Sequence, residues 1–64
     1  MNDPMELAER VRRECIETAL AAYEDAGIRG LCEDGRWEVA IAAIRGLDLE
    51  PVVREFQVRA RGAM

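Results

Sequence analysis

One stretch limits the fold of this chain more than any other: residues 5 to 26 contain neither proline nor glycine. Before it, Asp3 is suited to cap a helix and Pro4 to occupy the first helical position. At about 100° per residue the apolar side chains gather on one broad face, which holds Ala8, Val11, Cys15, Ala19, Ala22, Tyr23 and Ala26, with Met5 and Ile16 at its edge. The pattern predicts a long amphipathic helix over residues 4–26.

A glycine-rich connection follows this helix. Gly27 is expected to end the helix in the left-handed conformation, with Ile28 making the apolar contact of a Schellman motif. Residues 27–35 contain three glycines and therefore indicate a turn-rich segment. Leu31 and Cys32 are apolar within it, and we expect them to pack under the core.

Two shorter helices are predicted after the connection. Residues 35–45 carry apolar side chains at the i, i+3, i+4, i+7 spacing of a buried helical stripe, namely Trp37, Ala40, Ile41 and Ile44. A third helix over about 49–58 could be capped by Asp48, with Pro51 tolerated in its first turn. The valine-rich composition of that segment also favours a strand, so an extended conformation stays open.

Together these elements predict one small all-α domain. Helices over about 4–26 and 35–45 should pack as an antiparallel hairpin, with the third helix beside them. We assign the domain to residues 1–58 and expect residues 59–64 to form a frayed tail. A chain of this length buries only roughly 60% of its surface on folding. Small domains often gain stability from oligomerisation, so we expect self-association or a protein partner.

The side-chain composition excludes several functions. All nine basic residues are arginine, and histidine and serine are absent, which leaves no Ser-His or Cys-His pair and no His-bearing zinc site. Thirteen acidic residues give a net charge of −4, which argues against a nucleic-acid partner. No apolar run approaches the ~18–20 residues of a membrane span, and residues 1–4 do not resemble a secretory signal. We expect a cytoplasmic protein with no membrane partner.

Cys15 and Cys32 are the only credible nucleophiles in the chain. Cys15 falls on the predicted apolar face, and no cation adjoins either cysteine in the sequence to activate its thiol. The two are seventeen residues apart, and no second pair completes a metal site. We therefore expect both cysteines to be structural, and we predict no catalytic residue, no cofactor and no metal.

A local pattern runs from Gly35 to Pro51: glycine, an aromatic, Glu, Ala-Ile, an apolar residue three further on, and a closing Leu-x-Leu-x-Pro. It resembles the second half of a tetratricopeptide repeat, and Tyr23 with Gly27 resembles the ending of the repeat's first helix. The resemblance implies protein or peptide binding on a helical groove. Such repeats normally need at least three copies of about 34 residues, so a single copy requires a stacking partner, which could be a second copy of itself.

The strings Ala-Tyr-Glu-Asp-Ala-Gly and Gly-Arg-Trp-Glu also resemble small bacterial proteins, some of which are labelled acetyltransferase. The chain is too short for a sheet with a cofactor pocket, and it has no glycine-rich phosphate loop. We therefore do not expect acyl transfer.

The leading prediction is a non-enzymatic helical interaction module that self-associates through its apolar face. The residues expected in the contact or in the core beneath it are Tyr23, Trp37, Ile41, Ile44 and Phe56. Two alternatives belong to other classes. One is a small DNA-binding regulator that reads DNA with the second helix, and the other is a cysteine-dependent redox or acyl-handling accessory protein.

Overall fold

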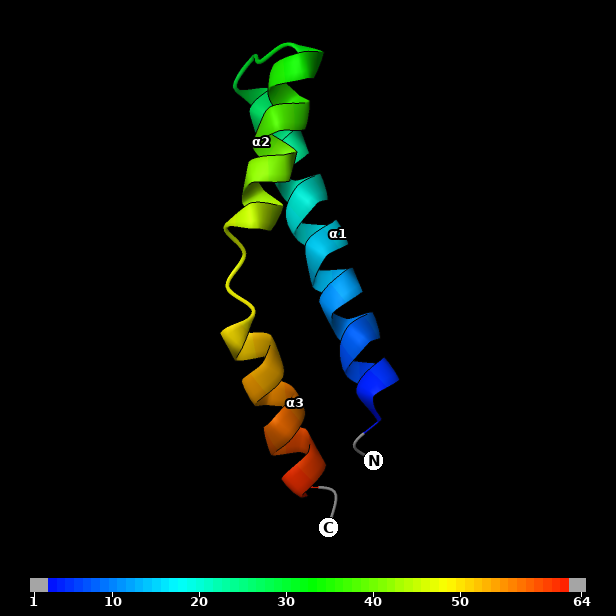
Figure 1. The fold of residues 1–64 in the computed structure, drawn as a ribbon. Coiled ribbons are helices and arrows are strands. Elements are labelled where there is room, and N and C mark those ends of the chain that lie inside the picture. Colours follow the sequence, from blue (N-terminus) through cyan, green and yellow to red (C-terminus); the bar gives the residue numbers. More distant parts are fainter. Residues whose placement is uncertain (1–2, 63–64) are drawn as a thin grey trace.

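The computed structural model describes residues 3–62, which form three helices and no strand (Figure 1). α1 spans Pro4–Ile28, α2 spans Glu33–Arg45 and α3 spans Glu50–Gly62. The predicted all-α fold, with a helical hairpin and a third helix, is confirmed. The extended alternative for the third segment is wrong.

Aspartates begin two of the helices, as predicted. The backbone N–H of Met5 donates to Oδ1 of Asp3 at 3.0 Å, and Pro4 follows as the first residue of α1. At the start of α3, the N–H of Glu50 donates to Oδ1 of Asp48 at 3.1 Å. Such caps satisfy N–H groups that have no partner inside the helix, and each contributes about 1 kcal/mol.

The C-terminus of α1 differs from the prediction. Gly27 continues the helix, and the left-handed residue is Gly30, with φ of +89°. The N–H of Gly30 donates to the carbonyl of Gly27, and that of Leu31 to the carbonyl of Ala26, both at 3.0 Å. These two bonds form a Schellman motif three residues later than expected. Leu31 is the half-buried apolar residue after the turn, whereas Ile28 is 85% exposed.

Arg36, from the first turns of α2, gives the physical reason why Gly27 is not the helix end. A Cβ at Gly27 would lie 3.2 Å from Cζ of Arg36, so the glycine allows the guanidinium to approach the α1 backbone. Nε of Arg36 donates to the carbonyl of Leu31 at 2.9 Å, and Cζ lies 5.9 Å from the centroid of the Tyr23 ring. One side chain of α2 thereby holds the last turn of α1 and the connection after it.

The molecule is a rod about two helices thick. α2 runs antiparallel to the C-terminal half of α1, and α3 continues beside the N-terminal half (Figure 1). The principal extents are 49 × 16 × 14 Å and the radius of gyration is 14.9 Å, against about 11 Å for a compact domain of this length. α3 ends at Gly62, so the helix extends beyond the predicted boundary at residue 58. The tail predicted at residues 59–64 is helical through residue 62, and residues 63 and 64 lie outside the described residues.

The core is small. Among residues 3–59 and 61, whose exposure the structure describes, only Ala26, Ala40 and Val52 are buried, one from each helix, and no large side chain is fully buried. A flat pair of helices covers only a narrow sector of each helix, so wide apolar faces stay partly open to solvent. The prediction that Cys32 packs under the core is wrong, since its side chain is exposed.

Candidate interaction surface

The predicted contact or core residues divide between the two halves of the rod. Tyr23 on α1 and Ile41 and Ile44 on α2 are half-buried in the half where these helices pair. Trp37, also on α2, is 63% exposed, so it does not fill the groove between the helices. Phe56 is half-buried on α3, along the other half of α1, and does not join the other four.

Two further apolar side chains lie near Tyr23 on α1. Ile16 is 52% exposed and Leu20 is 58% exposed, and at about 100° per residue the three side chains fall within about 60° of one another. Around the axis of α1, all three lie about 60–120° from the buried Ala26, and all in the same direction. The predicted apolar face has Ile16 only at its edge and does not include Leu20. Leu20 lies four residues after Ile16 and three before Tyr23, and this spacing is the signal that could identify it.

Trp37 and Ile41 of α2 lie on the same side of the rod as these residues. They are rotated about 60° and 100° from the buried Ala40, in the same sense as the α1 set is rotated from Ala26. In a pair of antiparallel helices, side chains that are rotated in the same sense about their own helix axes, away from the facing residues, project on the same side of the pair. We call the resulting surface the apolar flank and define it by Ile16, Leu20, Tyr23, Trp37 and Ile41.

The remaining exposed large apolar residues are dispersed, and they are Met5, Ile28, Leu49 and Val58. Single exposed apolar residues are common on protein surfaces, whereas contiguous ones mark contact sites. The apolar flank is therefore the candidate functional site.

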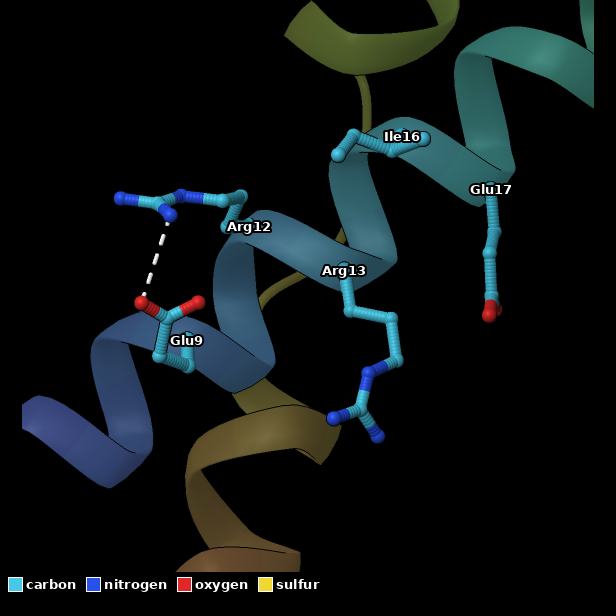
Figure 2. Close-up of a pocket in the computed structure, with 5 residues that line it drawn as sticks. All are labelled: Glu9, Arg12, Arg13, Ile16 and Glu17. Carbon is cyan, nitrogen blue, oxygen red and sulfur yellow. Dashed lines mark ion pairs between the residues drawn. The ribbon is translucent and has the colours of Figure 1, made fainter.

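Charged side chains border the α1 part of this flank. A shallow hollow is lined by Glu9, Arg12, Arg13, Ile16 and Glu17, and Figure 2 shows α3 and its linker passing behind α1 at this point, so the hollow faces away from them. Arg12 pairs with Glu9 at 3.3 Å. In residues 3–62, neither Arg13 nor Glu24 has an ion-pair partner.

The opposite flank of α1 is polar and closed. Arg10, about 120° from Ile16 around the helix, forms ion pairs with Glu14, at 3.9 Å, and with Glu55 of α3. A hollow beside these groups includes Pro51 and the buried Val52. The polar flank of α1 thus contacts the third helix, while none of the three described helices covers the apolar flank.

The part of the chain that the structure describes shows no cluster suited to metal chemistry. Cys15 is half-buried and Cys32 is exposed at the N-cap of α2, and both thiols are free. Among residues 3–62, no three His, Cys, Asp or Glu side chains come together as a set that could hold an ion. None of the described helices combines the length and the apolar character needed to cross a membrane.

Comparison of the chain with models of protein families, with curated proteins and with solved structures finds no match. The resemblances to a tetratricopeptide repeat and to bacterial proteins labelled acetyltransferase therefore stay predictions.

Proposed function

We propose that this chain is a small, non-enzymatic protein-interaction module that self-associates through the apolar flank. The main support for the proposal is that small side chains are buried in this structure while large apolar side chains are exposed to solvent. Three small residues form the core, while Ile16, Leu20 and Trp37 remain more than half exposed. Aromatic residues are enriched among those that dominate binding energy at interfaces.

The shape of the molecule supports the same proposal. A rod two helices thick leaves its apolar side chains in water, and each large aliphatic side chain gains about 1.5–3 kcal/mol on full burial. A second pair of helices laid against the flank would turn the rod into a bundle with an interior. The resemblance to a tetratricopeptide repeat is consistent with this, since such units need stacking partners.

The cytoplasm is the compartment that we propose. Cys32 is exposed and free, and an exposed thiol persists in the reduced state in the cytosol but is readily oxidised outside it.

Trp37 offers a direct test because it is the only tryptophan in the chain. We expect the molar mass from light scattering to rise with concentration through the micromolar range. Over the same range the Trp37 fluorescence should shift to shorter wavelength as the ring leaves water. A monomeric mass and an unchanged spectrum throughout that range, with helical circular dichroism retained, would remove the proposal.

A further inference from the structure

This inference rests on the proposed self-association and names its geometry: we propose that two copies of the chain pack antiparallel, α1 against α1, about a twofold axis at the level of Thr18. Two residues of an antiparallel symmetric pair meet under two conditions. They must lie equally far from the axis in opposite directions along the helix, and on the same side of the line of contact. The sequence of α1 can be compared with both conditions.

The apolar centre lies on the contact line itself, with Ile16 about 20° to one side of the line and Leu20 about 20° to the other. Ile16 lies two residues before Thr18 and Leu20 two residues after it, and their directions differ by about 40°. The axis therefore places Ile16 of each copy against Leu20 of the other. Four aliphatic side chains, each more than half exposed in the single chain, are covered at the centre of the contact.

On one side of this centre, the twofold rotation places charges of opposite sign against each other. Arg13 lies five residues before Thr18 and Glu24 six residues after it, and both project about 20° apart on the same side of the contact line. Arg13 of each copy therefore meets Glu24 of the other. Neither residue has an ion-pair partner within the described part of its own chain, so the contact supplies partners that the fold does not.

Aromatic rings lie on the other side of the centre. Arg12 lies six residues before Thr18 and Tyr23 five residues after it, again about 20° apart. Arg12 of one copy reaches the Tyr23 ring of the other, on the side where Trp37 projects from α2, and a guanidinium is attracted to such faces. Its own pair with Glu9 is exposed and contributes little.

A second copy of this chain is favoured over an unrelated partner because the side chains along this face of α1 are complementary to the same side chains in reverse order. Arg12 and Arg13 lie in the N-terminal half of the contact, and Tyr23 and Glu24 lie in its C-terminal half, so reversal matches unlike groups. Glu9 also lies on the contact line, and the residue that reversal places against it is the uncharged Gly27. One position opposes the arrangement. Glu17 lies one residue before Thr18, at the rim, where the two Glu17 carboxylates approach each other.

Charge reversal in two separate variants tests the register. Arg13→Glu places two carboxylates at each rim contact and Glu24→Arg places two guanidinium groups there, so each variant alone should raise the dimer Kd roughly 10- to 100-fold. An equimolar mixture of the two variants restores an Arg–Glu pair at both contacts. We expect this mixture to form a heterodimer with a Kd near that of the unaltered chain.

The control for charge alone is Asp25→Arg. Asp25 is one residue from Glu24 but about 100° away around α1, where it pairs with Arg29 at 3.0 Å. We expect this variant to dimerise as the unaltered chain does, and circular dichroism should show that all variants remain helical.

The apolar centre has its own matched pair of variants. Leu20→Glu should raise the dimer Kd about 100-fold or more, since it places two carboxylates in the buried centre. Val58→Glu makes the same change in charge at a residue of similar exposure, 59% against 58%, and should leave Kd unchanged. Glu17→Gln should lower Kd about twofold, because it removes the like-charge approach at the rim.

The outcomes separate this inference from the proposed function. If the unaltered chain dimerises but the two charge variants do so equally well, or if their mixture gains nothing, the antiparallel α1 contact is wrong and self-association stands. If the unaltered chain stays monomeric throughout the micromolar range, both are wrong.

Discussion

The two ends of the rod are joined to α1 in different ways. At one end α2 is held by a Schellman turn, by one buried alanine from each helix and by Arg36, which lies over the backbone at Gly27. At the other end α3 is held by one buried valine and the ion pair of Arg10 with Glu55. The turn and the contacts of Arg36 therefore specify the hairpin, whereas one buried side chain and one ion pair position the third helix. We expect the hairpin to unfold as a unit and α3 to separate from α1 at a lower cost in free energy.

The largest effect that weakens the hairpin should come from Gly30→Ala. Gly30 has φ of +89°, and the left-handed conformation costs a residue with a Cβ about 1–2 kcal/mol. Denaturant unfolding should show a loss of about that size.

The matched control is Gly46→Ala. Gly46 also follows a helix, but its φ is −91°, and a Cβ there would make only an ordinary contact of 3.5 Å. It should change the stability by less than half as much. Equal losses at both glycines would show that the turn after α1 is not the constraint.

A smaller effect should reveal how closely Arg36 and Gly27 are coupled. Arg36→Ala removes the hydrogen bond to Leu31 and the contact with Tyr23, and it should cost about 1 kcal/mol. In that background Gly27→Ala should stabilise the chain by up to about 1 kcal/mol, because alanine is the better helix former.

The same Gly27→Ala change in the unaltered chain should give less than this gain or a loss, since the Cβ would lie 3.2 Å from the guanidinium. A double-mutant cycle from thermal unfolding measures the difference. Additive effects would show that Arg36 does not lie over Gly27 in solution.

The smallest effect concerns α3. Glu55→Gln removes the ion pair with Arg10 of α1, and because Glu55 is half exposed the loss should be below about 1 kcal/mol. Hydrogen exchange should become faster in α3 and stay unchanged in α2. Glu50→Gln is the control, because Glu50 pairs with Arg54 inside α3 and should leave the docking intact. Faster exchange in α2 as well would mean that the two ends are not independent.

Much of this fold could be predicted from the sequence because its signals are local. The caps at Asp3 and Asp48 and the stripe that contains Ala40 need only neighbouring residues. The choice between Gly27 and Gly30 does not, since both satisfy the local rule for a helix end. It depends on Arg36, which reaches the turn only once α2 has packed.

The candidate surface was predicted less well, for a related reason. Periodicity shows which side chains share a face, but not how wide a sector the rest of the chain will cover. Because each helix has so little covering it, Trp37 and Ile16 lie outside the buried sector. Leu20 was missed although its spacing from Ile16 and Tyr23 places it on their face.

The elongated shape also determines which hydrodynamic measurement would detect association in solution. With a length of 49 Å and cross-sections of 16 and 14 Å, a single chain diffuses somewhat more slowly than a sphere of the same mass. A second rod laid alongside doubles the mass while adding almost nothing to the length. Elution volume in gel filtration would then change less on pairing than it does when two spheres of that mass join, whereas the sedimentation coefficient would rise more, because the particle becomes rounder.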